Sequence, residues 1–118
     1  MIKSQQQKRE RKQIKNIFSE KITTIYNNTL TIGNGMSMTI QLRESDGPIN
    51  IPLHTHPAPG TVYLIDGNVQ VNIEGKLKEF TSGDVWIEPA LKKHSGKSEG
   101  PIKYFVVYHH PNDQSYTN

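Results

Sequence analysis

His54 and His56, two histidines separated by a single residue, are the residues of this sequence best suited to chemistry. Side chains alternate between the two faces of a β-strand, so residues two positions apart project from the same face. Two imidazoles on one face can bind one ion, and histidine is the commonest protein ligand for transition metals. A third histidine, His94, follows after a strand–turn–strand stretch. The three histidines together predict a metal site.

Three neutral imidazoles would leave coordination positions open for water, a substrate or dioxygen, as catalytic metal sites require. The remaining histidines, His109 and His110, are adjacent and would point to opposite faces of a strand, so we expect structural or exposed roles for them. The absence of cysteine excludes disulfides, cysteine-bound zinc and thiol nucleophiles. Arg43 is the only arginine outside the N-terminal segment, so no arginine pair predicts a phosphate or dicarboxylate site.

The elements that must position these histidines are short runs of β-forming residues separated by turn signals. Asn27-Asn28 is a predicted turn, and the polar stretch 89–101 is a predicted loop. Two prolines, Pro52 and Pro57, favour an edge strand or a strand end around the first two histidines. Many short strands without an interior helix signal indicate an all-β sandwich or barrel. The expected strands are 21–26, 36–43, 49–56, 61–65, 68–73, 76–80, 85–87 and 102–109.

The clearest strand pattern lies at 36–43, where apolar residues alternate with polar ones and predict a half-buried strand. In a small barrel, inward-facing side chains line a cavity that opens at one end. We expect that cavity to be lined by Met38, Ile40, Trp86 and Tyr104. An apolar cavity of this kind would suit a small, weakly polar substrate.

Charge is distributed unevenly along the 118 residues. Residues 1–15 hold six basic residues and one acidic residue, whereas the remainder carries a slight negative charge. We therefore expect a basic arm or short helix at 1–18 and a β-barrel domain at 19–118. The arm does not predict nucleic-acid binding, because a solvated arm explains the same composition. No apolar run reaches the length of a signal sequence or a membrane span, so we expect a soluble, cytoplasmic chain without a membrane partner.

Two stretches resemble the conserved motifs of the cupin superfamily, which read G-x5-H-x-H-x3,4-E-x6-G and G-x5-P-x-G-x2-H-x3-N. The matching residues are His54-x-His56-x3-Gly60-x6-Gly67 and Gly83-x5-Pro89-x-Leu91-x2-His94. The resemblance covers about 36–110 and implies a cupin-type β-barrel of the RmlC-like kind, a double-stranded β-helix or jelly roll. It also implies that His54, His56 and His94 bind a divalent transition metal, namely iron, manganese, nickel or zinc.

This sequence departs from the family pattern at the glutamate of the first motif, where Gly60 stands. Other departures are Pro48 in the place of the first glycine, Leu91 in the place of the second-motif glycine, and Ser98 in the place of the asparagine. The site would then be a three-histidine centre, similar to cupins that hold ferrous iron for dioxygenation. Alternatively, Glu88 supplies the lost carboxylate or acts as a catalytic acid or base; an exposed acid at a strand end is the simpler interpretation. Loss of the carboxylate also makes an empty metal site an alternative.

Two functions remain open from the sequence. The first is a metal-dependent enzyme of the dioxygenase, isomerase or lyase type acting on a small molecule. The second is a non-catalytic module that binds or senses a small ligand and has a degenerate metal site. We also expect a homodimer that pairs through edge strands, with the segment up to Tyr26 reaching the partner.

Overall fold

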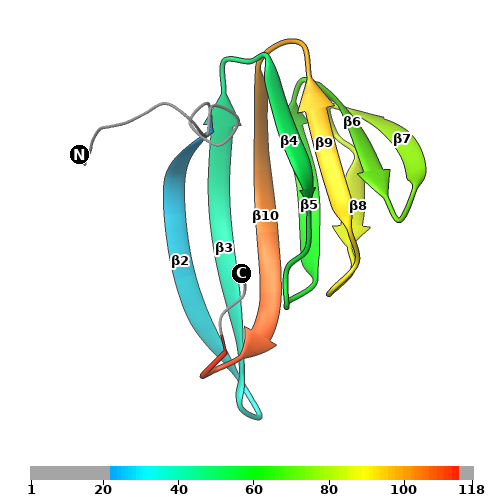
Figure 1. Ribbon diagram of the computed structural model, residues 1–118. Helices are drawn as coiled ribbons and strands as arrows, with labels where there is room; N and C mark the ends of the chain where they lie inside the picture. The colour runs from blue at the N-terminus through cyan, green and yellow to red at the C-terminus, as the bar shows by residue number, and fades with distance from the viewer. Residues whose placement is uncertain (1–21, 115–118) are drawn as a thin grey trace, which may run out of the picture.

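A computed structural model describes residues 22–114, which form nine β-strands and no helix (Figure 1). The expected all-β fold is confirmed, whereas the expected basic arm at 1–18 lies outside the described residues. No helix suited to spanning a membrane occurs in the described part of the chain. The strands are β2 (Thr23–Gly33), β3 (Met36–Ser45), β4 (Ile49–His54), β5 (Gly60–Asp66), β6 (Asn68–Ile73), β7 (Lys76–Thr81), β8 (Val85–Glu88), β9 (His94–Ser98) and β10 (Ile102–Pro111).

The strands form two antiparallel sheets that enclose a core between them. The larger sheet has the order β2-β3-β10-β5-β8, and the smaller one has the order β4-β9-β6-β7. The chain crosses repeatedly from one sheet to the other, which is the jelly-roll arrangement of a cupin-type barrel. Figure 1 shows β2 and β3 at one side of the molecule and the hairpin of β6 and β7 at the other. The core residues between the sheets include Ile49, Ala58, Val62, Leu64, Ile102 and Val106.

The predicted turn at Asn27-Asn28 is wrong, because both residues lie inside β2. There they pair with β3, and the side-chain amide of Gln41 donates a hydrogen bond of 3.2 Å to Asn27. The turn lies further along, where Asn34 and Gly35 both have positive φ values of 55° and 76°. Two consecutive residues with positive φ form the tight hairpin turn that matches the twist of antiparallel strands. Pairing with β3 therefore outweighs the local turn preference of the two asparagines.

The predicted loop at 89–101 is also wrong in part, because it contains β9. This strand has no large apolar residue, yet it is central in the smaller sheet and pairs with β4 on one side and β6 on the other. β9 is held by backbone hydrogen bonds to both neighbouring strands. Backbone pairing requires no hydrophobic side chains, so the sequence shows no strand pattern here. β4 ends the order of its sheet. The edge position that its proline predicted is therefore confirmed.

The two faces of the larger sheet differ sharply in composition. Directly opposed residues of neighbouring strands share a face, so the register shows which side chains point away from the core. On that outward side the strands carry mainly apolar residues, and we call this surface the outer apolar face. It comprises Tyr26, Leu30, Met36, Met38, Ile40, Leu42, Tyr63, Val85, Ile87, Phe105 and Val107.

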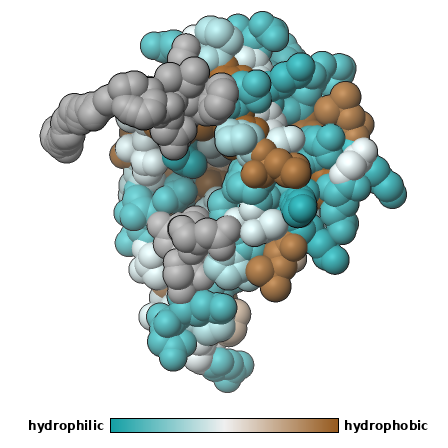
Figure 2. Space-filling view, in the orientation of Figure 1, coloured by the Kyte–Doolittle hydropathy of each residue, from teal (hydrophilic) through white to brown (hydrophobic). Residues whose placement is uncertain are grey.

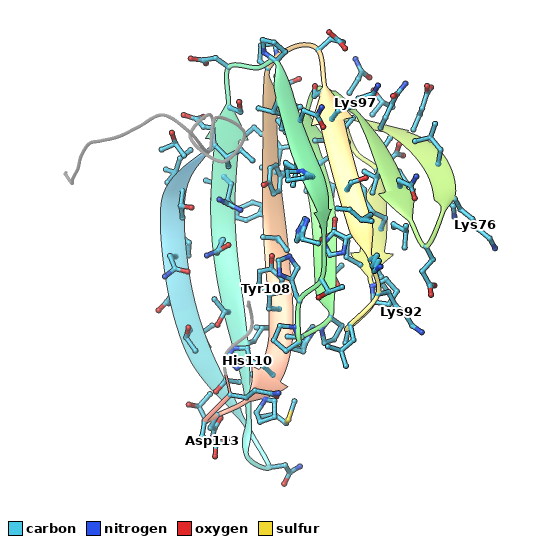
Figure 3. The ribbon with its side chains drawn as sticks, in the orientation of Figure 1. Lys76, Lys92, Lys97, Tyr108, His110 and Asp113 are labelled. Atoms are coloured by element: carbon cyan, nitrogen blue, oxygen red, sulfur yellow. The ribbon has the colours of Figure 1, made fainter. Side chains whose placement is uncertain are left out.

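The inner side of β3 is polar and tightly hydrogen-bonded instead. Thr39 is fully buried, and its hydroxyl lies 2.7 Å from Nε2 of His110 and 2.8 Å from the hydroxyl of Thr29. His110 follows Tyr108 on the inner side of β10 (Figure 3), whereas His109 is exposed on the other side. The two adjacent histidines therefore face opposite ways, as expected, and His110 has a structural role.

Candidate metal centre

Three histidines meet where β4 and β9 lie side by side. His54 is the last residue of β4 and pairs directly with His94, the first residue of β9. His56 lies two residues beyond the end of β4 and turns back toward them. One ligand atom from each ring lies within 4.8 Å of the ligand atoms of the other two. The structure thus brings together the three residues that the sequence singled out.

Hydrogen bonds to backbone carbonyls fix two of the rings. Nδ1 of His54 lies 2.8 Å from the carbonyl oxygen of Pro52, and Nδ1 of His94 lies 3.1 Å from that of Lys92. Because a carbonyl only accepts, each Nδ1 carries a proton, and Nε2 is the nitrogen left to bind an ion through the lone pair of the neutral ring. Fixing of the second ring nitrogen in this way is typical of histidines that bind metals.

The spacing of the ring nitrogens suits one shared ion. Nε2 of His54 and Nε2 of His56 lie 3.2 Å apart. Two nitrogens that each bind one zinc ion at about 2.1 Å would lie about 3.0–3.4 Å from each other. The observed separation falls inside that range, so the pair could bind a single ion with little movement.

Two buried nitrogens of this cluster have no hydrogen-bond partner, namely Nδ1 of His56 and Nε2 of His94. A buried polar atom without a partner costs about 1–3 kcal/mol, so such atoms are uncommon without a bound group. Burial, followed by the charges of His54, His94 and Arg43, lowers the pKa of His56 to about 4. The ring is therefore neutral at neutral pH, which is the form that binds a metal ion. Nitrogen donors of this kind fit iron, nickel or zinc.

Glu88 lies beside the histidines, and the interpretation of it as an exposed strand-end acid is wrong. Its side chain is only 16% exposed, and Oε1 lies 3.4 Å from Nε2 of His94. The indole N–H of Trp86 donates a hydrogen bond of 3.3 Å to Oε2. Trp86 is itself held by stacking on Phe80, with ring centroids 4.2 Å apart. The carboxylate is therefore positioned at the site by its own strand.

Gly60 lies directly opposite Glu88 on the neighbouring strand β5. A Cβ atom at Gly60 would lie 3.0 Å from a ring carbon of Tyr108 and 3.4 Å from a methyl group of Val106. Tyr108 in turn packs edge-on against His56, with ring centroids 5.6 Å apart. The space beside position 60 is thus filled by Tyr108, and the carboxylate of Glu88 lies on the neighbouring strand at the same level of the barrel.

A cavity of about 430 Å³ extends from the histidines into the barrel. This volume lies within the range of small-molecule sites, and most of the walls are aliphatic. Besides the histidines and Glu88, its lining includes Ile22, Gln41, Arg43, Ile49, Ile51, Val62, Leu64, Val69, Val71, Trp86, Ile102, Tyr104, Val106 and Tyr108. Trp86 and Tyr104 thus line the cavity, as the sequence indicated.

Met38 and Ile40 do not line this cavity, and their expected role is corrected here. They belong to the outer apolar face, because the register of β3 directs them away from the core. Their polar neighbours Gln41 and Arg43 line the cavity in their place. Alternation in the sequence separates two faces of a strand, but it does not say which face lines a functional cavity. Had the polar face been considered, the same pattern would have identified Arg43.

Comparisons with known proteins agree with this architecture. The family model for the cupin domain matches residues 37–108 of the chain. No protein of curated function matches the sequence significantly.

Solved structures share the fold at low sequence identity. An RmlC-like cupin from Shewanella frigidimarina superposes with a TM-score of 0.59 at 18% identity, covering 74% of this chain and 86% of that one. KdgF from a Halomonas species gives 0.56 at 16% identity, covering 71% and 86%. The DMSP lyase DddQ from Ruegeria pomeroyi gives 0.67 at 15% identity, covering 86% of this chain but 53% of the lyase. At these identities the likeness concerns the fold alone.

Proposed function

Since the chain belongs to the cupin domain family, we propose that His54, His56 and His94 hold a divalent transition metal ion beside the barrel cavity. The observation that carries this proposal is the convergence of three imidazoles, with two buried ring nitrogens that make no hydrogen bond. Iron, manganese, nickel and zinc are the candidate ions. A bound ion of this kind would polarise a substrate oxygen or provide a position for dioxygen.

In this proposal Glu88 takes the role of the family's glutamate, whose position in the first motif is occupied by Gly60. Its position opposite Gly60 and its distance of 3.4 Å from His94 support that role. As a ligand, the carboxylate would add the negative charge that helps to hold a divalent ion. As a general acid or base, it would move a proton at Oε1 while Trp86 holds Oε2.

The activity in this framework is that of a small-molecule enzyme of the dioxygenase, isomerase or lyase type. The aliphatic walls of the cavity would surround the substrate and exclude water, while His54, His56 and His94 fix its reacting end. Glu88 is the one carboxylate among the described residues that line the cavity. It is therefore the residue to which we assign proton transfer.

A non-catalytic module that binds or senses a small ligand is the second candidate. The scarcity of acid–base groups favours it, since Glu88 is the sole carboxylate among the described lining residues. Turnover that requires the metal would support the enzyme. Ligand binding that chelator treatment leaves unchanged, without turnover, would support the module.

Calorimetric titration of chelator-treated protein with Zn²⁺ and Mn²⁺ tests the metal site and the role of Glu88. For Glu88→Gln we expect at least a tenfold weaker metal affinity if the carboxylate is a ligand. If the metal affinity of Glu88→Gln is unchanged, Glu88 is not a ligand. A loss of turnover in this variant would then support its role as a general acid or base. Glu79→Gln is the matched control, because Glu79 is exposed on β7 and away from the cavity lining. Absence of metal binding by the wild-type protein would contradict the proposal.

A further inference from the structure

One cationic side chain, Arg43, lines the apolar cavity. It lies on the inner side of β3, directly opposite Tyr104 of β10. Its Nε donates a hydrogen bond of 3.1 Å to the hydroxyl of Thr24. No carboxylate in the described part of the chain lies within ion-pair distance of it. An arginine side chain that lines an apolar cavity, with no described carboxylate at ion-pair distance, is a feature that a bound anion would explain.

Tyr104 adds a second hydrogen-bonding group beside this cation. Burial raises the pKa of its hydroxyl, although the charge of Arg43 and a hydrogen bond from the guanidinium act against that rise. The phenol is therefore neutral at neutral pH. Because it accepts from Arg43, its own O–H remains a donor for a further acceptor. Arg43 and Tyr104 together present N–H and O–H donors to one point of the cavity wall.

The cavity thus has two polar regions joined by aliphatic walls. One contains the three histidines and Glu88, and the other contains Arg43 and Tyr104. A molecule spanning them needs an anionic group at one end and an apolar body.

We propose that the ligand of this cavity is a small monocarboxylate with an apolar body. Its carboxylate would accept hydrogen bonds from the terminal nitrogens of Arg43 and from the hydroxyl of Tyr104. Its other end would lie at the histidines. That second contact rests on the proposed metal site, but the carboxylate contact does not require a metal ion. A dianion is disfavoured, because Glu88 is negative and no second cation lines the cavity among the described residues.

The test compares ligands that differ only in charge, namely benzoate with benzamide and hexanoate with hexanamide. Affinities are measured by NMR titration with chelator-treated and zinc-loaded protein. We expect both proteins to bind a carboxylate at least tenfold more tightly than its amide. Arg43→Gln should abolish that preference by weakening carboxylate binding far more than amide binding. Lys103→Gln is the matched control, since Lys103 lies on the other side of the same sheet and outside the cavity lining.

Three results would overturn the carboxylate proposal. They are equal affinities for acid and amide, an unchanged preference in Arg43→Gln, and no binding of either pair at millimolar concentration. Failure of the metal proposal gives a different pattern: the carboxylate preference persists in chelated protein and in His56→Ala, while no metal binds. The two proposals can therefore fail separately.

A second, independent observation is the outer apolar face of the larger sheet. No element of the described chain covers it, and several of its side chains are well exposed, with Tyr63 at 43% and Val85 at 56%. Five of its apolar side chains, those of Tyr26, Leu30, Tyr63, Val85 and Ile87, are 42–59% exposed, and a contiguous exposed apolar surface of this kind is typical of an interaction site. By contrast, the face seen in Figure 2, where β4 and β9 lie, is mainly hydrophilic with separate hydrophobic residues.

We infer that a second copy of this chain covers the outer apolar face. The charges that the register places on the outward side of β3, β10 and β5 are Glu44, Lys103 and Asp66. Lys103 lies opposite both carboxylates on the neighbouring strands, so each charge that pairing of two copies would bury has a partner of opposite sign. The chain's own remaining residues are poor candidates. Residues 1–21 contain seven basic residues but only five apolar ones. The described chain also begins at Ile22, which lines the cavity on the opposite side of the sheet.

This arrangement pairs sheet faces, in place of the edge-strand pairing expected from the sequence. Sedimentation equilibrium of the full chain should show a dimer at micromolar concentrations. Tyr63→Glu and Val85→Glu should each weaken dimerisation at least 100-fold, because each buries a carboxylate in the interface. Leu77→Glu is the control, since Leu77 is 63% exposed on β7, an edge strand of the other sheet.

A wild-type monomer at 100-fold higher concentration would overturn the inference. A dimer that survives both substitutions on the outer apolar face would overturn it as well, and dissociation by Leu77→Glu alone would indicate an edge contact. Circular dichroism of each variant separates loss of pairing from loss of folding.

Discussion

Along β3, the side that faces the barrel interior carries Ser37, Thr39 and Arg43, whereas the outward side carries Met38 and Ile40. A strand in a barrel wall ordinarily directs its apolar residues to the core and its polar ones to solvent. Here the polar side holds a hydrogen-bonded structural cluster and part of the cavity wall. The apolar side forms part of a surface without a cover among the described elements. Hydrophobicity alone therefore does not identify the functional side of this sheet.

Among substitutions on the two sides, the largest effect is expected on the inner side of the barrel, for metal affinity. His94→Ala removes a ring that is 3% exposed and pairs with His54. Metal affinity should fall at least about 100-fold, because even partners that only orient a ligand contribute 10–100-fold. Calorimetric titration with Zn²⁺ checks the result. A smaller loss than in Glu88→Gln would mean that His94 is not a principal ligand.

The sequence was sufficient for much of this inner site but not for all of it. Spacing predicted the meeting of the three histidines, because pairing geometry follows from local alternation and motif order. The same reasoning missed β9, whose backbone pairing has no hydrophobic pattern, and it assigned Met38 and Ile40 to the wrong side. Those features depend on which strands become neighbours. The position of Glu88 beside the histidines was one of the alternatives left open by the sequence, and it follows from the register of Glu88 with Gly60.

Next in size is the effect of breaking the polar cluster of the inner side. Thr39→Val keeps the shape of the fully buried side chain but removes the hydroxyl that contacts His110 and Thr29. The free energy of unfolding should fall by about 1–3 kcal/mol, because Nε2 of the buried His110 loses this hydrogen bond. Urea denaturation measures the change. An unaltered midpoint would show that the cluster does not stabilise the sheet.

The glycine opposite Glu88 gives a comparable test of packing. Gly60→Ala places a Cβ atom 3.0 Å from the ring of Tyr108, so that ring must move. We expect a loss of about 1–2 kcal/mol in the free energy of unfolding, typical of an overpacked core. Thermal denaturation of the metal-free protein provides the measurement. A stabilised variant would show that the barrel relaxes freely at this position.

The smallest effect on the folded monomer should come from the outward side. Val85→Thr replaces a side chain that is 56% exposed, and surface changes of this kind usually alter the free energy of unfolding by less than about 0.5 kcal/mol. Measured at a concentration where the protein is monomeric, its urea midpoint should match that of the wild type. A loss above about 1 kcal/mol there would mean that this side is covered within the monomer itself.

The metal content of the purified protein tests the central claim most directly. Mass spectrometry of protein prepared without chelator or affinity metal should find close to one iron, manganese, nickel or zinc ion per chain. His56→Ala should retain less than a tenth of that content, whereas His109→Ala should retain all of it, because His109 is exposed on the outward side. Absence of metal even after reconstitution, or equal metal in wild type and His56→Ala, would contradict a metal centre at these three histidines.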